Sequence, residues 1–195
     1  MTHRLFAALP VSDDLAGRLL PLKLDGPGLS WRRADQYHVT LHFFGGVSIE
    51  LAEEIAFRLD RIAFLPFQFA VAGVGWFGRR QPRALYARLA PSAELEHLAS
   101  ACRDIARELK LEHERRPFTP HITLAYCNET PIDNVKTWAN TYQALRTDHV
   151  SVDQFHLYES FTGRGALRKI PRWRENDRRK ADWIMRGAAS QAVSP

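Results

Sequence analysis

A chain of 195 residues, 45% hydrophobic and 25% charged, can bury one sizeable core or two small lobes that share an interface. Its composition is ordinary for a soluble globular protein, and no apolar run approaches the roughly 20 residues of a transmembrane helix. Two cysteines, Cys102 and Cys127, exclude a disulfide framework. Because the N-terminus leads directly into strand-like sequence without a signal-peptide core, we expect a cytoplasmic protein with reduced thiols.

The net charge of +5 is concentrated near the C-terminus. Between Arg164 and Arg186, nine Lys and Arg accompany three Asp and Glu, so this segment carries +6 and the remainder about −1. Such asymmetry indicates contact with a polyanion, although a solvated tail kept for solubility explains the charge equally well. We expect residues 1–173 to form one domain and 174–195 to form a basic, then Ala/Ser-rich tail that is partly disordered.

Strands and helices are expected to alternate along the chain. Hydrophobic periodicity, helix caps, and glycine or proline breaks give their bounds. In chain order we expect a strand at 4–9, a helix at 12–22, a strand within 31–44, a helix at 48–62, a hairpin of 67–77 with 84–89, a helix at 91–111, a strand at 121–126, a loosely helical stretch at 131–145, a long strand at 150–161 and a short edge strand within 167–173. This order predicts an α+β fold.

Two of these strands carry the same four-residue pattern. His38-Val39-Thr40-Leu41 recurs as His121-Ile122-Thr123-Leu124. Because side chains alternate between the faces of a strand, each histidine and threonine project from one face, and the apolar residues, with Phe43 after the first motif, face the core. Either strand alone is explained by an ordinary, hydrogen-bonded histidine. Together, the two strands indicate a site for an anionic group in a cleft between two lobes, with helices on the outer faces.

Two histidines and two threonines suit in-line displacement at phosphorus. Histidine titrates near neutrality, so one imidazole can act as general base and the other as general acid. Threonine hydroxyls can donate hydrogen bonds to the non-bridging oxygens of a phosphate without a metal. Charge that builds on these oxygens needs a cation, and Arg116 or Arg115, just before the second motif, can supply it.

Other chemistries are less well supported. Zinc catalysis usually needs three protein ligands, but the chain has no His-Glu-x-x-His, no Cys-x-x-Cys and no acidic residue beside either motif. A cysteine nucleophile is disfavoured because Cys102 falls on the apolar stripe of a helix. No glycine-rich phosphate loop follows a strand, so use of a nucleoside triphosphate is not indicated. We therefore expect no metal and no cofactor.

In their context the two motifs resemble the two-histidine phosphoesterase superfamily, and within it the bacterial and archaeal RNA 2′,3′-cyclic phosphodiesterases, also called 2′-5′ RNA ligases. The resemblance spans about residues 4 to 173. It is carried by the segments 4–8, 38–45, 116–124, 152–160 and 170–173. It implies a bilobal fold, with two pseudo-twofold-related lobes of antiparallel sheet and one motif from each lobe at the cleft.

The same resemblance implies an activity and roles for the motif residues. The implied reaction opens a terminal 2′,3′-cyclic phosphate of RNA, or of a cyclic nucleotide, to a 2′-phosphate without metal. His121 would be the proton acceptor that activates water, and His38 the proton donor to the leaving 3′ oxygen. Thr40 and Thr123 would hold the phosphate. The reverse reaction exchanges the two histidine roles.

Further residues are candidates for the walls of the cleft. His42 and Phe44 continue the face of His38, so both are expected at the cleft, where Phe44 either stacks on a base or packs. Tyr158 and Phe6 either border the site or belong to the core. His149 opens a third, similar segment that has Ser in place of Thr, and we interpret it as an ordinary strand.

Two other functions stay open from the sequence. One is an RNA-binding or 2′-5′ end-joining factor that depends on the basic segment after Arg164. The other is a non-catalytic phosphate-binding module, which the presence of both histidines disfavours. In each case the expected partner is RNA or a nucleotide rather than a membrane, and a monomer is expected.

Overall fold

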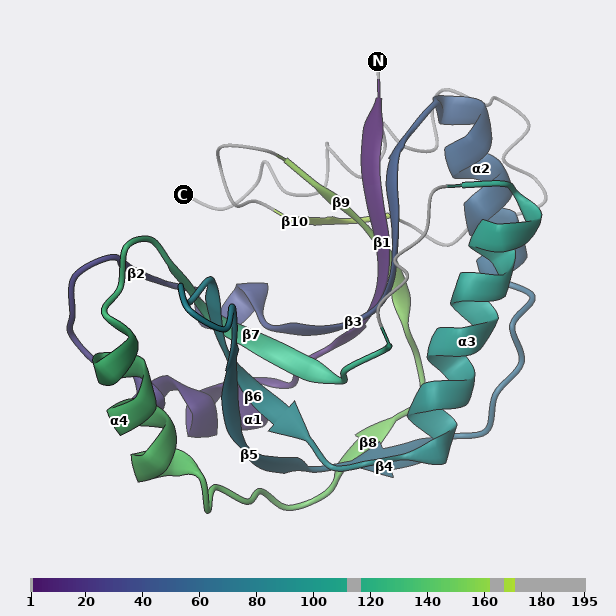
Figure 1. The fold of residues 1–195 in the computed structure, drawn as a ribbon. Coiled ribbons are helices and arrows are strands. Elements are labelled where there is room, and N and C mark those ends of the chain that lie inside the picture. The colour runs from purple at the N-terminus through teal and green to yellow at the C-terminus, as the bar shows by residue number, and fades with distance from the viewer. Residues whose placement is uncertain (1, 112–116, 162–166, 171–195) are drawn as a thin grey trace, which may run out of the picture.

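The computed structural model describes residues 2–111, 117–161 and 167–170 (Figure 1). The expected tail at 174–195, most of the basic segment after Arg164, and Arg116 lie outside the described residues. In chain order the elements are β1 His3–Pro10, α1 Asp13–Leu19, β2 Leu29–Trp31, β3 His38–Val47, α2 Ile49–Leu59, β4 Phe67–Phe69, β5 Val71–Phe77, β6 Ala84–Leu89, α3 Ala93–Glu108, β7 His121–Cys127, α4 Ile132–Tyr142, β8 Val150–Val152, β9 His156–Ser160 and β10 Leu167–Lys169. These elements confirm the α+β class.

The first three helices begin where their caps predict. Ser12, Ser48 and Ser92 precede α1, α2 and α3, and each side-chain oxygen accepts a hydrogen bond from a backbone N–H three residues on. The helices end earlier than expected. After α1 the chain tightens into a 3₁₀ turn at 20–22, which contains Pro21, because proline lacks the N–H that would continue the helix.

Two strands that were expected to be continuous are each divided. The segment 67–77 forms β4 and β5, and the segment 150–161 forms β8 and β9. β4 and β8 pair with each other in a separate two-stranded sheet, whereas β5 and β9 belong to the main sheet. Asp153 and Gln154, both exposed, carry the chain from one sheet to the other.

The main sheet is antiparallel and consists of two blocks. Its order is β10-β9-β1-β3-β7-β6-β5, with β2 also paired to β7. A single residue pair, Val39 with Ile122, joins β3 to β7, so β10-β9-β1-β3 forms one block and β7-β6-β5 with β2 forms the other. The two motif strands are therefore neighbours where the blocks meet. The twofold relation expected between two lobes stays a prediction.

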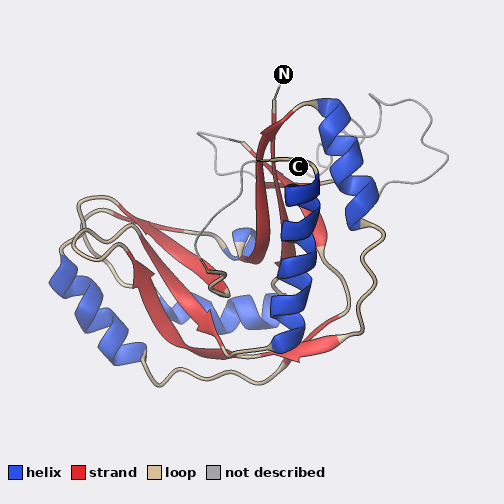
Figure 2. Cartoon of the chain, turned by 45° about the vertical axis from the view of Figure 1, so that its right-hand side comes forward, coloured by secondary structure: helices blue, strands red, loops and turns tan. Residues whose placement is uncertain are grey.

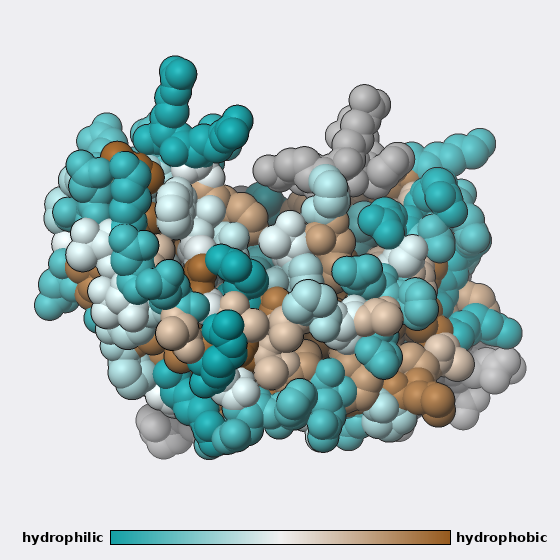
Figure 3. Space-filling model, turned by 60° about the horizontal axis from the view of Figure 1, so that its bottom comes forward, coloured by the Kyte–Doolittle hydropathy of each residue, from teal (hydrophilic) through white to brown (hydrophobic). Residues whose placement is uncertain are grey.

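Helices cover the outer sides of this bent sheet (Figure 2). α2 packs on β1, α3 packs on β3 and α2, and α4 packs on β5. Fully buried apolar residues fill the space between strands and helices, with Leu5, Leu9, Ile55, Leu95 and Ile122 among the largest. The face in Figure 3 is mostly hydrophilic, with apolar side chains scattered across it. Among the described residues, every helix is too short or too polar to span a bilayer.

Candidate active site

His38 is the first residue of β3, and a backbone carbonyl fixes its ring. Its Nδ1–H donates a hydrogen bond to the carbonyl oxygen of Gln36 over 2.8 Å. A carbonyl can only accept, so the neutral ring carries its proton on Nδ1 and leaves a lone pair on Nε2. Nε2 is therefore the nitrogen that can exchange a proton with a substrate.

His121 is the first residue of β7 and is held in the same way. Its Nδ1–H donates to the carbonyl oxygen of Thr119 over 2.6 Å. In both motifs the acceptor lies two residues before the histidine, which fixes the same tautomer in both rings. The repeated four-residue pattern thus comes with a repeated local geometry that the sequence did not reveal.

A phenylalanine and a tyrosine lie against each imidazole. The centroid of the His38 ring lies 5.0 Å from that of Phe6 and 6.4 Å from that of Tyr158. Phe6 is on β1, which pairs with β3, and Tyr158 is on β9, which pairs with β1. Phe6 is 4% exposed and belongs to the core, whereas Tyr158 is partly exposed beside His38, and its place at the border of the site stays a prediction.

The second imidazole has a matching environment. Phe77 on β5 lies 4.8 Å from the His121 ring and Tyr86 on β6 lies 5.4 Å from it, centroid to centroid. β6 pairs with β7, and β5 pairs with β6. Each histidine therefore has one aromatic neighbour from the adjacent strand and another from the strand beyond.

Burial lowers the pKa of both histidines. The pKa of His38 falls from 6.5 to about 4, mainly through burial, with smaller contributions from the positive charges of Arg32 and His121, while the hydrogen bond to Gln36 raises it. The pKa of His121 is also lowered by burial, against the hydrogen bond to Thr119. Without an anion in the site, both rings are neutral at pH 7.

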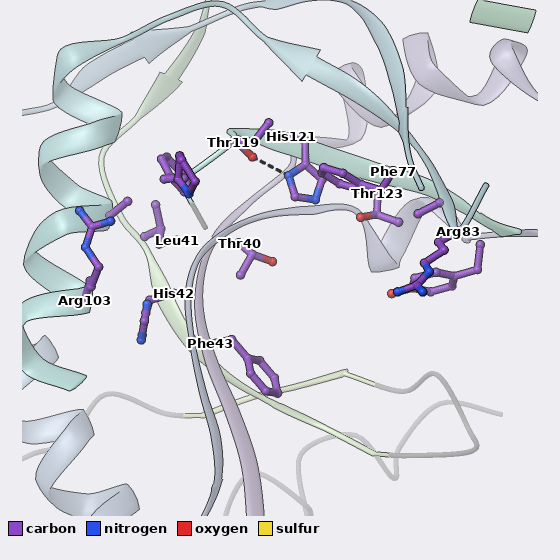
Figure 4. Close-up of a pocket in the computed structure, with 15 residues that line it drawn as sticks. Thr40, Leu41, His42, Phe43, Phe77, Arg83, Arg103, Thr119, His121 and Thr123 are labelled. Atoms are coloured by element: carbon purple, nitrogen blue, oxygen red, sulfur yellow. Dashed lines mark hydrogen bonds between the residues drawn. The ribbon is translucent and has the colours of Figure 1, made fainter. Parts of the chain in front are cut away.

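A pocket of about 570 Å³ brings residues of the two motifs together. Thr40 from β3 and His121 and Thr123 from β7 line it, whereas His38 is not among the lining residues, and its place at the site stays a prediction. Figure 4 shows the hydroxyl groups of Thr40 and Thr123 turned toward the space between them, with the His121 ring beside it. Hydroxyls at this place can donate hydrogen bonds to a phosphate bound near His121.

Two arginines line the same pocket, Arg83 and Arg103, and neither was predicted as a site residue. Arg83 precedes β6 and Arg103 is on α3, and Figure 4 shows them at opposite sides of the cavity. Arg83 closes a basic turn that is visible in the sequence, but no pattern marked Arg103. Arg116, the cation expected from the sequence, lies outside the described residues. Among the residues that the structure describes, the arginines that line the pocket are Arg83 and Arg103.

The faces expected for Phe43 and Phe44 were wrong, and of the two roles left open for Phe44 the structure supports packing. Phe44 is 2% exposed in the core and cannot stack on a base, whereas Phe43 is 39% exposed and lines the pocket. The register between β1 and β3 shifts twice, between Leu5 and Phe6 and between Ala7 and Ala8. These irregularities break the alternation of faces after Thr40. His42 lines the pocket as expected, at 6% exposure.

Two aromatic side chains at the pocket lie beneath arginines. Phe43 and Tyr126 each follow a motif histidine by five residues, and both line the pocket. The guanidinium carbon of Arg4 lies 4.9 Å from the Phe43 ring centroid, and that of Arg32 lies 5.5 Å from the Tyr126 centroid. Such surfaces can stack on nucleobases.

Cysteine chemistry finds no support in the described residues. Both cysteines are free thiols, as expected, and Cys102 is fully buried on α3, where burial raises its pKa to about 12. A thiol with so high a pKa is a poor nucleophile near neutrality. No group of three or more His, Cys, Asp or Glu side chains in the described residues is arranged to hold a metal ion.

Comparison with known proteins agrees with the motif geometry. The model of the 2′-5′ RNA ligase superfamily matches residues 12–164. The chain belongs to this superfamily. The resemblance inferred from the two His-x-Thr strands is thereby confirmed.

Curated relatives in the superfamily are RNA 2′,3′-cyclic phosphodiesterases. The protein of Archaeoglobus fulgidus is 30% identical over 85% of this chain and 96% of its own length. That of Thermotoga maritima is 29% identical over 86% of this chain and 92% of its own length. The protein of Geobacillus stearothermophilus is 28% identical over 86% of this chain, which spans about half (54%) of that relative.

Solved structures share the fold of this chain. Escherichia coli LigT in its apo form superposes with a TM-score of 0.67 at 26% identity, covering 88% of this chain and 96% of LigT. The Thermus thermophilus protein TT0787 gives a TM-score of 0.66 at 22% identity over 85% of this chain and 93% of its own. The superfamily fold therefore extends over most of the chain.

Proposed function

We propose that this protein hydrolyses 2′,3′-cyclic phosphate ends of RNA, or nucleoside 2′,3′-cyclic phosphates, to 2′-phosphates. The main support is the matched pair of imidazoles, each held at Nδ1 by the carbonyl two residues before it and each free to exchange a proton at Nε2. The activity of the curated relatives agrees with this proposal.

The proposed reaction uses side chains that line the pocket together with His38, which precedes the pocket residue Thr40 by two positions on β3. His121 Nε2 accepts a proton from water, whose oxygen attacks phosphorus. The bond from phosphorus to the 3′ oxygen breaks, and His38 Nε2–H donates a proton to that oxygen, which leaves a 2′-phosphate and a free 3′ hydroxyl. Thr40 and Thr123 donate hydrogen bonds to the non-bridging oxygens. Arg83 or Arg103 balances their charge.

The proton on His38 depends on the substrate in this proposal. In the empty site its pKa is about 4, so the ring is neutral at pH 7. An anionic phosphate next to the ring favours the protonated form and raises this pKa. His38 therefore carries the proton that it donates only when the phosphate is bound.

The aromatic residues of the pocket would bind the base. Phe43 and Tyr126 are exposed and line the pocket on β3 and β7. Stacking on an aromatic ring contributes about 1–3 kcal/mol per base and tolerates every base. The site therefore suits RNA ends without a strict sequence preference.

The presence of two such rings favours a second candidate function, the joining of ends through a 2′-5′ linkage. A base on each ring would place two nucleosides on either side of one phosphate. A 5′ hydroxyl in the position of water would then attack the cyclic phosphate. Incubation of a cyclic-phosphate end with a 5′-hydroxyl RNA, followed by analysis for 2′-5′ linkages, tests this candidate, and absence of joined product at saturating ends rejects it.

Hydrolysis of 2′,3′-cyclic AMP tests the main proposal. The expected product is 2′-AMP, which chromatography separates from 3′-AMP, and its rate should be the same with and without EDTA. No turnover, 3′-AMP as product, or complete inactivation by EDTA would each contradict the proposed mechanism. The position of the phosphate is the most informative of these results, because it reports which bond was broken.

A further inference from the structure

The turn between β5 and β6 carries three arginines beside the pocket. Residues 78–83 form this turn, and Arg79, Arg80 and Arg83 are exposed in it. We infer that this basic turn binds the RNA strand upstream of the reacting nucleotide. The inference rests on the proposed function and assigns a binding surface outside the reacting pocket.

The turn has a fixed shape. Gly78 has a φ of +94°, and a Cβ atom on it would lie 2.0 Å from the carbonyl oxygen of Gln81, so only glycine fits there. The backbone N–H of Arg83 donates to the carbonyl of Phe77 over 2.8 Å, and Pro82 is buried. The turn thus presents Arg79 and Arg80 to solvent.

The three arginines of this turn differ from other arginines of the chain in their ion pairing. Several arginines that do not line the pocket form ion pairs, namely Arg18, Arg33, Arg58, Arg107 and Arg168. Among the residues that the structure describes, no carboxylate forms an ion pair with Arg79, Arg80 or Arg83. Exposed cations without partners are available to neutralise phosphates.

The turn is continuous with the pocket. Phe77 and Arg83, the residues on either side of Gly78 to Pro82, both line the pocket, and Phe77 contacts the His121 ring. The backbone N–H of Cys127 donates to the carbonyl of Arg83 over 2.9 Å, which places the end of the turn next to the strand that carries Tyr126. A strand that leaves the pocket on the side of Arg83 therefore meets Arg80 and Arg79 next.

A polymer of phosphates is the partner that fits this arrangement. A cyclic mononucleotide has one phosphate, which the pocket would occupy, and so gains nothing from cations beyond it. An RNA strand has a further phosphate at each nucleotide, and sequence-independent contacts to these phosphates come from arginines. The turn is therefore expected to distinguish RNA ends from mononucleotides.

The double variant R79A/R80A tests this inference. The control is R61A/K136A, which removes two exposed charges, one just after α2 and one on α4. Each protein is assayed on 2′,3′-cyclic AMP and on a single-stranded RNA of about ten nucleotides that ends in a 2′,3′-cyclic phosphate. In R79A/R80A the ratio of kcat/KM for RNA to kcat/KM for the mononucleotide should fall roughly tenfold, through KM, as expected for two exposed charge contacts. The slope of log kcat/KM for RNA against log salt should become shallower by about 1.4, and the control should keep both values.

An unchanged ratio in R79A/R80A, or an equal loss on both substrates, would overturn the inference. If the native protein turns over neither substrate, the proposed hydrolysis fails, and the turn is tested by fluorescence anisotropy with the same RNA carrying a 3′-phosphate. Weaker binding by R79A/R80A than by the control then supports the turn as an RNA-binding surface, and equal binding overturns it.

Discussion

The two blocks of the sheet build the two sides of the site from the same parts. In each block the motif histidine is the first residue of its strand, and its Nδ1–H donates to the carbonyl two residues before it. In each block the next two strands supply one phenylalanine and one tyrosine, but in opposite order. Phe6 then Tyr158 follow β3, and Tyr86 then Phe77 follow β7.

The two sides differ in the electrostatics of their histidines. The pKa of His38 falls to about 4 because burial is reinforced by the positive charges of Arg32 and His121, whereas for His121 burial is the cause of the lowering. The motif and its hydrogen bond are the same on both sides, so they cannot produce this difference. The acidity of a repeated catalytic residue is set by its surroundings, and equal motifs need not have equal roles.

Loss of either imidazole should have the largest effect. In His38→Ala or His121→Ala, kcat for 2′,3′-cyclic AMP should fall by a factor of about 10² to 10⁴, because each variant loses one proton-transfer group. His149→Ala is the control, since His149 lies directly before a strand, β8, and is exposed and not among the residues that line the pocket. Turnover by either motif variant at the rate of the control would contradict the two-histidine mechanism, provided that circular dichroism shows folded proteins.

Substitutions of the neighbouring residues Phe43 and Phe44 should affect different properties, substrate binding for Phe43 and stability for Phe44. Phe44→Ala should lower the free energy of unfolding by about 3–5 kcal/mol, because it empties a buried site. Phe43→Ala should leave unfolding nearly unchanged and raise KM by roughly fivefold or more through lost stacking. Tyr126→Ala should behave as Phe43→Ala does if the two sides both hold a base. Denaturant titration and steady-state kinetics measure both effects, and a KM effect confined to Phe44→Ala would refute the assignment.

Most elements of the fold followed from local signals in the sequence. Serine caps placed the helix starts, and the repeated His-x-Thr pattern placed β3 and β7 as motif strands. The expectations that were wrong concern features that depend on pairing between strands. The register shifts that exchange Phe43 and Phe44 arise against β1, and the division of 150–161 follows from two different partners, β4 and β1. A sequence pattern of period two does not contain such irregularities.

The candidate site was predictable to a similar degree. The two histidines and two threonines could be selected as candidates because two copies of one pattern are visible without a structure, and three of the four, Thr40, His121 and Thr123, line the pocket. The pocket arginine Arg103 was not, because a single polar residue on an amphipathic helix looks like any solvated position. Arg83 was visible only as part of a basic turn, and its place at the pocket depends on the pairing of β6 with β7.

The low pKa of His38 should be detectable as a dependence of stability on pH. Below pH 6.5 the unfolded chain binds a proton at this position, and the folded protein does not until about pH 4, so acid favours the unfolded state. Between pH 7 and pH 4 the native protein should therefore lose about 3 kcal/mol more unfolding free energy than His38→Gln, which cannot titrate there. Denaturant titrations at both pH values measure this difference. Equal losses of unfolding free energy in the two proteins would show that the pKa of His38 is not lowered in the folded state. The same comparison for His121→Gln should give a smaller difference.

The two threonines provide the finest test of equivalence between the two sides. Thr40→Val and Thr123→Val remove one hydroxyl each at nearly constant volume, and Figure 4 shows both hydroxyls directed into the same space. If each donates to a phosphate oxygen whose charge grows during the reaction, each variant should lose kcat by about 10- to 100-fold, because a hydrogen bond to a charged group contributes about 1.5–3 kcal/mol. The double variant then decides whether the two act on one phosphate. Independent contacts give a loss equal to the product of the single losses, whereas hydroxyls that hold one phosphate together give a smaller combined loss, since the first substitution already misplaces the group that the second would bind. Full kcat in both single variants would leave the phosphate without its proposed donors.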